Sequence, residues 1–93
     1  MIWTKQGVSG DLQPIVAKAL GKVGRLAEEH GEDVYITSKR DYFHSYGSLH
    51  PDGWAFDMRP LATVTIGMIK RLLGPDFDVV DEGNHWHIEY DPK

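Results

Sequence analysis

The sequence contains no cysteine, so no disulfide can cross-link the chain and no thiolate can act as a nucleophile or a metal ligand. Any metal site in this chain must therefore be built from histidine and carboxylate side chains. Concentrated positive charge is also missing, since 10 Lys and Arg stand against 14 Asp and Glu and are scattered along the chain. Binding to a phosphate backbone needs a concentrated basic face, so we expect no nucleic-acid partner.

Long apolar runs are missing too. No stretch approaches the roughly 20 apolar residues that span a bilayer, and the first ten residues, MIWTKQGVSG, lack the apolar run of a signal peptide. We therefore expect a protein that is cytoplasmic as synthesised and does not insert into a membrane. A chain of 93 residues can bury one modest core, which predicts a single domain over residues 1–93, expected to be a monomer.

Apolar spacing and turn residues predict the elements. Apolar residues at helical spacing predict one helix from Asp11 to about His30 and a shorter one that begins near Thr63 or Thr65 and is closed by Gly74-Pro75. Four strands are predicted at residues 33–38, 54–58, 77–80 and 85–90, of which the last two form a hairpin. The order α, β, β, α, β, β predicts an α+β domain with two helices and a small, largely antiparallel sheet.

Two details of the first predicted helix can be checked against a structure. Asp11 is the expected N-cap, with Pro14 in the first turn where its missing N–H costs little. Gly21 and Gly24 each weaken a helix by about 1 kcal/mol relative to alanine. Their presence implies that another element presses closely on this helix.

Residues suited to metal chemistry gather in two clusters. Ser48 to Asp57, SLHPDGWAFD, places His50 and Asp57 seven positions apart around a glycine. The second cluster, EGNHWH at residues 82–87, begins in the hairpin turn. In the last strand, alternation places Trp86, Ile88 and Tyr90 on one face and His85, His87 and Glu89 on the other.

One such histidine alone is more often a hydrogen-bonded surface or core residue than a ligand, but two clusters that each adjoin a strand favour a metal site. A catalytic zinc takes three protein ligands and leaves a fourth position for water. His50, Asp57 and His87 could supply the three ligands. Glu82 and His85 are then the candidates for moving the proton during hydrolysis.

The first cluster also carries a family signature. Its residues match in full the pattern S-x-H-x-x-G-x-A-x-D, through Ser48, His50, Gly53, Ala55 and Asp57. Through this pattern the chain resembles two related groups of enzymes. They are the zinc D-alanyl-D-alanine carboxypeptidases and dipeptidases, and the phage L-alanyl-D-glutamate endopeptidases. The C-terminal EGNHWHIEYD is similar to the HxH element that these peptidases share with lysostaphin-type enzymes and with the hedgehog signalling domain. The resemblance implies a hedgehog-like zinc fold.

The resemblance implies one Zn²⁺ per chain, with His50 and Asp57 as ligands. In family members with HxH the second histidine is the third ligand and the first assists catalysis, which gives His87 and His85 these roles. In members with E-x-x-H, the glutamate is the base and the histidine three positions later is the ligand, which gives Glu82 and His85. The sequence satisfies both patterns, and we favour His87 because HxH on one strand face is the more constrained arrangement.

Three further residues receive roles from the resemblance. Arg40 lies in a place like that of the family's arginine that holds the substrate carbonyl or the developing oxyanion. Ser48 would hydrogen-bond a ligand or the substrate, and His44 would line the cleft. Each of the three has an ordinary alternative as a solvated loop residue.

The activity implied is zinc-dependent hydrolysis of a peptide bond next to a D-amino acid in the stem peptides of peptidoglycan. Such an enzyme, of the phage endolysin kind, would act on the cell wall after release or as part of a phage lysis or virion apparatus. Carboxypeptidase and endopeptidase action both remain open. Two alternatives are a zinc-containing binding or virion-structural module that cleaves nothing, and a metal-free protein in which both clusters are structural.

Overall fold

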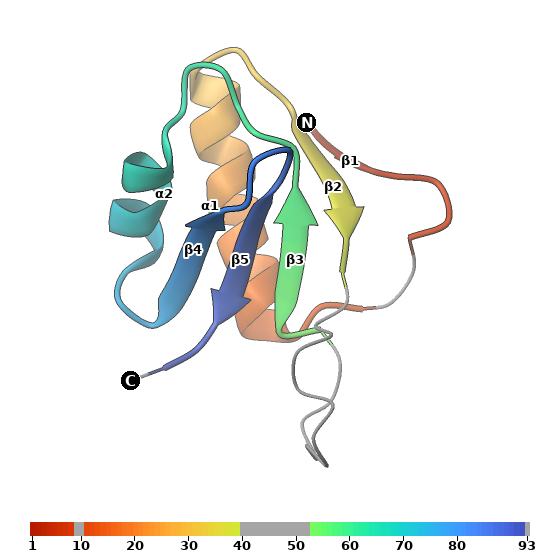
Figure 1. Ribbon diagram of the computed structural model, residues 1–93, viewed down its shortest axis with the longest axis vertical. Coiled ribbons are helices and arrows are strands. Elements are labelled where there is room, and N and C mark those ends of the chain that lie inside the picture. The colour runs from red at the N-terminus through yellow and green to blue at the C-terminus, as the bar shows by residue number, and fades with distance from the viewer. Residues whose placement is uncertain (9–10, 40–52, 93) are drawn as a thin grey trace.

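In the residues that the structure describes, five strands form one sheet and two helices cover one of its faces (Figure 1). This computed structural model describes residues 1–8, 11–39 and 53–92. Its elements are β1 (Ile2–Thr4), α1 (Pro14–Glu29), β2 (Val34–Ser38), β3 (Ala55–Met58), α2 (Ile66–Leu73), β4 (Phe77–Asp81) and β5 (Trp86–Tyr90). The predicted α+β class is confirmed, and both helices and four of the strands lie where the sequence places them.

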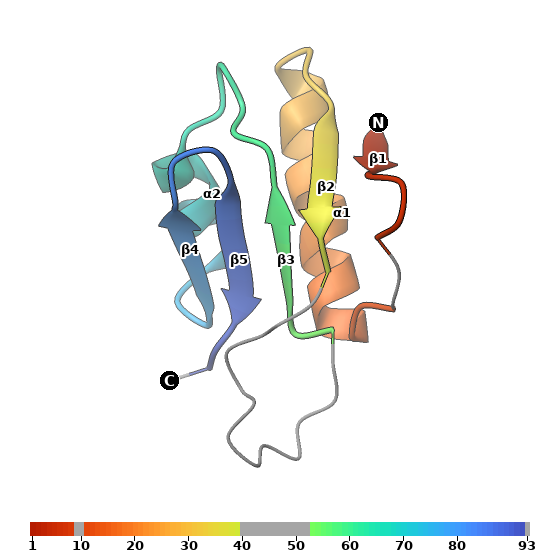
Figure 2. The same ribbon diagram turned by 45° about the vertical axis from the view of Figure 1, so that its right-hand side comes forward.

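The strands lie in the order β1-β2-β3-β5-β4, with β1 parallel to β2 and every other neighbouring pair antiparallel. β4 and β5 form the predicted hairpin. β1, which Figure 2 shows at the edge beside β2, was not predicted. Its three residues are too few to display an alternating pattern, and all three are exposed.

The core lies between the helices and the sheet. From α1 it receives Val16, Val23 and Ala27, and from α2 it receives Ile69, all of them buried. From the sheet it receives Ile36, Phe56, Met58, Trp86 and Ile88. Burying each large apolar side chain contributes about 1.5–3 kcal/mol, so the alternation along β3 and β5 is fixed by this layer. The residues between them must then face away from the helices.

The α1 N-cap and one of the two helix glycines differ from the prediction. The N-cap is Gln13 rather than Asp11, and its side chain makes no capping hydrogen bond. Pro14 opens the helix, where its missing N–H leaves no donor unsatisfied. Gly24 does face a close neighbour, because a Cβ there would lie 2.7 Å from Cδ1 of Ile2. Gly21 faces open space, so the prediction of close packing is wrong at that position.

No helix in the described part of the chain has the length and apolar character needed to cross a membrane. α1, the longer of the two, is 16 residues long. It is amphipathic, with its buried residues on the face that packs on the sheet and charged residues elsewhere.

Glu32 ties the end of α1 to the segment before α2. Its carboxylate accepts hydrogen bonds from the backbone N–H of Ala62 and of Thr63, both at 2.7 Å, and from the Thr63 hydroxyl. The Thr63 hydroxyl, followed by these backbone donors, lowers the pKa of Glu32 from 4.5 to about 2. The hydrogen bonds that join Glu32 to Ala62 and Thr63 are therefore strongest when the Glu32 carboxylate is ionised.

We expect stability to fall as Glu32 is protonated. A lowered pKa means that the stabilisation is fully present above pH 4.5 and is lost as pH falls through about 2. Thermal unfolding followed between pH 6 and pH 2 should therefore show a steeper loss of melting temperature in the wild type than in Glu32→Gln. Parallel profiles for the two proteins would contradict this role.

Candidate metal centre

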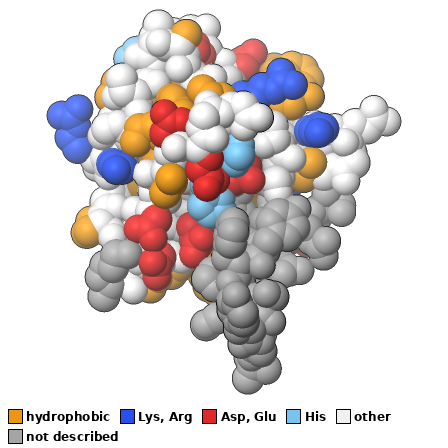
Figure 3. Space-filling model, in the orientation of Figure 1, with side chains coloured by type: hydrophobic (Ala, Val, Ile, Leu, Met, Phe, Trp, Pro, Cys, Tyr) orange, Lys and Arg blue, Asp and Glu red, His pale blue; other side chains and the backbone are white. Residues whose placement is uncertain are grey.

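The sheet face opposite the helices carries histidines set among carboxylates. Figure 3 views the molecule from this side and shows histidine side chains next to Asp and Glu near the middle of the face. Asp57 lies on β3 and His87 lies directly opposite it on β5. Glu82 and His85 belong to the turn between β4 and β5, and Glu89 follows His87 by two positions on the same strand.

His87 lies between two carboxylates. Its Nδ1 is 2.6 Å from Oδ1 of Asp57, and its Nε2 is 3.0 Å from Oε1 of Glu89. All three side chains are mostly buried, with 10% of His87, 18% of Asp57 and 16% of Glu89 exposed. The ring is therefore held in one orientation by a hydrogen bond at each nitrogen.

This environment favours the charged imidazole. The hydrogen bond to Asp57 raises the pKa of His87 to about 9, burial acts in the opposite direction, and the hydrogen bond to Glu89 adds to the rise. In the absence of a metal, both ring nitrogens therefore donate at neutral pH. A cation that binds at Nδ1 must displace a proton, as metal ions generally do when they bind histidine.

Glu82 and His85 form a second pair beside the first. Oε1 of Glu82 is 3.1 Å from Nε2 of His85, whose Nδ1 lies 2.7 Å from Oδ1 of Asn84. The backbone N–H of Glu82 donates to the carbonyl of His85 at 2.9 Å and closes the turn. About a third of each side chain is exposed, 39% for Glu82 and 33% for His85. Both groups can therefore be reached by water or a substrate.

Three of the described residues could together hold a metal ion. Asp57, Glu82 and His87 each offer a ligand atom, and these atoms lie within 4.8 Å of one another. Two ligands on a tetrahedral zinc with bonds of about 2 Å lie roughly 3.3 Å apart, so the Asp57–His87 pair needs only a slight opening. Nitrogen and oxygen donors without sulfur are the set used by many catalytic zinc sites.

The structure brings together four of the residues that the sequence singled out, namely Asp57, Glu82, His85 and His87. The other four, Arg40, His44, Ser48 and His50, lie outside the described residues. Of the two histidines that competed for the ligand role, His87 faces Asp57, whereas His85 faces Glu82 and Asn84. This geometry favours His87 as the ligand.

No family model matches this sequence, and neither a curated protein nor a solved structure matches it. A function can therefore be argued only from the sequence motifs and from the geometry of this site.

Glu89 is the residue of this site to which the sequence analysis gave no role. Strand alternation had already placed it on the same face as His85 and His87. Its contact with His87 depends on the side-chain conformations of two neighbours at i and i+2, which alternation alone does not specify.

Gly53, the glycine of the signature, has a structural reason to be glycine. Its φ of +102° lies in the region that side chains rarely adopt, and a Cβ there would overlap the carbonyl oxygen of Asp11 and lie 3.1 Å from the N–H of Gln13. That N–H donates to the carbonyl of Gly53 at 3.0 Å. The glycine thereby joins the start of α1 to the start of β3, two residues before the strand that carries Asp57.

Gly53→Ala should destabilise the protein by at least about 2 kcal/mol, because an unfavourable φ and a steric overlap act together. Chemical denaturation measures this loss directly. Gly21→Ala is the matched control, since a Cβ at Gly21 meets no atom within 4 Å and alanine favours a helix. Equal stability of Gly53→Ala and the wild type would contradict the account of this glycine.

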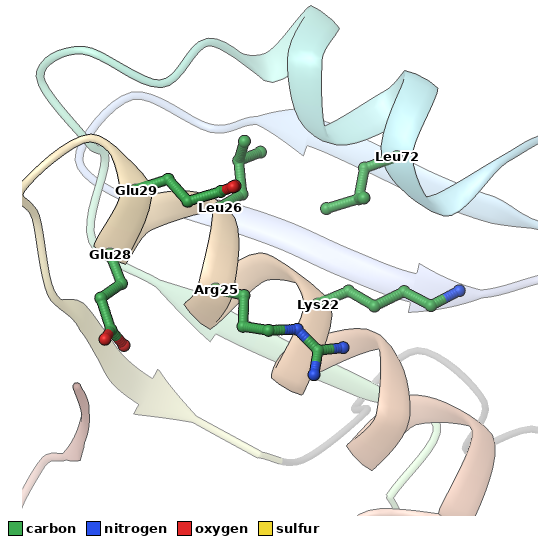
Figure 4. Close-up of a pocket in the computed structure, with 6 residues that line it drawn as sticks. All are labelled: Lys22, Arg25, Leu26, Glu28, Glu29 and Leu72. Atoms are coloured by element: carbon green, nitrogen blue, oxygen red, sulfur yellow. The ribbon is translucent and has the colours of Figure 1, made fainter.

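A groove between α1 and α2 lies on the other side of the sheet (Figure 4). It is lined by two basic, two acidic and two apolar side chains: Lys22, Arg25, Glu28, Glu29, Leu26 and Leu72. Among the described residues its lining has no histidine, and the charges of the lining side chains balance. The groove therefore adds nothing to the metal chemistry of the open face.

Proposed function

We propose that this protein is a zinc-dependent peptidase with the hedgehog-like fold of the D-alanyl-D-alanine peptidases, hydrolysing a peptide bond next to a D-amino acid in peptidoglycan stem peptides. The observation that carries the proposal is the contact between Asp57 and His87, 2.6 Å apart. Asp57 ends the signature SxHxxGxAxD and His87 ends the HxH element. Two motifs that are separate in the sequence thus meet at one point on the sheet.

One Zn²⁺ per chain would be held by Asp57 and His87, with His50 as the third ligand that the signature implies. When bound, such an ion polarises a substrate carbonyl and lowers the pKa of a bound water to about 7. His87 suits the ligand role because its ring is already fixed at both nitrogens. A fixed ligand loses little conformational freedom on binding a cation.

Glu82 is the residue best placed to move the proton. Its carboxylate belongs to the group that can surround a cation with Asp57 and His87, yet the side chain is 39% exposed. It would accept a proton during attack on the scissile carbonyl and return it to the leaving amine. His85 contacts the Glu82 carboxylate from the side, with Nε2 3.1 Å from Oε1 of Glu82. Arg40 would steady the oxyanion, as the resemblance implies.

The substrate is expected to bind on the open sheet face, since both helices cover the opposite one. A stem peptide of the cell wall, reached after release or through a phage lysis or virion apparatus, is the substrate class that the signature implies. We propose that the protein acts on it as a monomer.

The proposal is tested by incubating the zinc-loaded protein with defined muropeptides and analysing the products by mass spectrometry. We expect new products that disappear after chelation and return when zinc is restored. Loss of a terminal D-alanine would identify a carboxypeptidase, and separation of L-alanine from D-glutamate an endopeptidase. Intact muropeptides in the presence of one bound zinc would favour the alternative of a non-catalytic zinc module.

A further inference from the structure

We infer that Glu89 is a positioning residue of the metal site: by accepting a hydrogen bond from Nε2–H of His87, it directs the lone pair of Nδ1 toward the metal. The inference rests on the proposed function to the extent that it takes Asp57 and His87 as metal ligands. It gives a role to Glu89, which is neither a fixed position of SxHxxGxAxD nor a histidine of the HxH element.

The tautomer of His87 decides which nitrogen can bind a cation. A neutral imidazole carries one N–H, and the nitrogen without it is the ligand atom. An ionised carboxylate can only accept, so Glu89 at 3.0 Å from Nε2 keeps the proton on that nitrogen. Without a metal, Asp57 at 2.6 Å holds a proton on Nδ1 in the same way. When Asp57 and His87 bind a cation, the proton on Nδ1 is displaced, and Glu89 keeps the remaining proton on Nε2, so that Nδ1 is the ligand atom.

The two carboxylates that flank His87 lie on different sides of the candidate metal position: Asp57 beside it and Glu89 behind the ring. Asp57 belongs with Glu82 and His87 to the group whose ligand atoms can surround one cation, and Glu89 does not. Glu89 faces the far nitrogen of the ring instead. A carboxylate behind a metal-binding histidine fixes the ring and makes it a stronger ligand.

Glu89 is also held more firmly than Glu82. It lies on β5 between two paired strands, opposite Ala55 on β3 and opposite Asp78 on β4. Ala55 is fully buried, and the side chain of Glu89 is 16% exposed, against 39% for Glu82. A group fixed in this way can hold the ring of His87 before a metal arrives.

Three variants separate this role from a general effect of charge. Glu89→Ala removes the acceptor, and Glu89→Gln removes the charge but keeps an oxygen that can accept from Nε2–H. Asp78→Asn is the matched control, because it removes one carboxylate charge from the position directly opposite Glu89. Zinc affinity is measured by competition with a chelator, and circular dichroism and thermal unfolding verify that each variant is folded.

We expect zinc affinity to fall 10–100-fold in Glu89→Ala, the range found for groups behind a ligand histidine. Glu89→Gln should recover most of this loss, and Asp78→Asn should stay close to the wild type. In ¹⁵N NMR spectra of the zinc-loaded wild type, His87 should carry its proton on Nε2. Glu89→Ala should broaden or shift that signal.

Unchanged affinity in Glu89→Ala would overturn the inference, as would an equal loss in Asp78→Asn or zinc bound to Nε2 of His87. These results would leave the proposed function intact, because zinc would still bind. Absence of zinc binding in the wild type would overturn the inference and the proposed function together. None of these readouts depends on peptidase turnover.

Discussion

Asp57→Ala is expected to remove zinc from the protein and to reduce peptidase turnover to background. The substitution deletes one proposed ligand and also the carboxylate that lies 2.6 Å from Nδ1 of His87. Asp57→Asn keeps the shape of the side chain and removes the charge, so it should lose zinc with less effect on folding. His50→Ala should behave in the same way if the signature carries its usual ligand set. Elemental analysis and muropeptide cleavage measure the two losses.

The control for this experiment is His85→Ala, which should retain one zinc per chain. His85 contacts Glu82 and Asn84 on the same sheet face but does not belong to the group that can surround a cation. Full zinc content in Asp57→Ala would contradict the site. Loss of zinc in His85→Ala with retention in His87→Ala would move the ligand role to the E-x-x-H pattern.

Glu82→Gln is expected to keep zinc and to lower turnover by about 10²–10⁴-fold, the usual contribution of a general acid–base group. Glutamine has the same shape but cannot carry the proton. Since Glu82 is partly exposed in a turn, the substitution should leave the fold unchanged. Steady-state kinetics on a defined muropeptide, with zinc content measured in parallel, tests this. Glu29→Gln, on the groove of the opposite side, is the charge-matched control.

The same experiment distinguishes two roles of Glu82. Its carboxylate lies close enough to Asp57 and His87 to serve as a ligand. If Glu82→Gln loses zinc together with turnover, Glu82 is a third ligand rather than the base. If turnover is unchanged, another group moves the proton.

The class of fold could be predicted because the apolar spacing of both helices and the alternation of β5 are each imposed by one buried face. Trp86 and Ile88 must enter the core, and that fixes His87 on the opposite face. β1 could not be predicted, because three exposed residues show no pattern and their pairing with β2 depends on α1 crossing between them. The N-cap was misplaced because Gln13 caps the helix through its backbone alone.

The sequence singled out Asp57, Glu82, His85 and His87, which the structure places close together, but it did not predict their contacts. Strand register was needed to place Asp57 opposite His87, and β3 and β5 are separated in the chain by α2 and β4. A sequence pattern within one strand contains no information on that register. The sequence analysis favoured His87 over His85 as the ligand, and the structure adds that His87 faces Asp57 and that the far nitrogen of its ring contacts Glu89.

The central claim is that Asp57 and His87 hold one zinc ion between β3 and β5. It is tested most directly by anomalous diffraction at the zinc edge from crystals of the zinc-loaded protein. We expect one peak, about 2 Å from a carboxylate oxygen of Asp57 and from Nδ1 of His87. A peak bonded to His85 instead, or crystals grown with zinc that show no peak on this face, would contradict the claim.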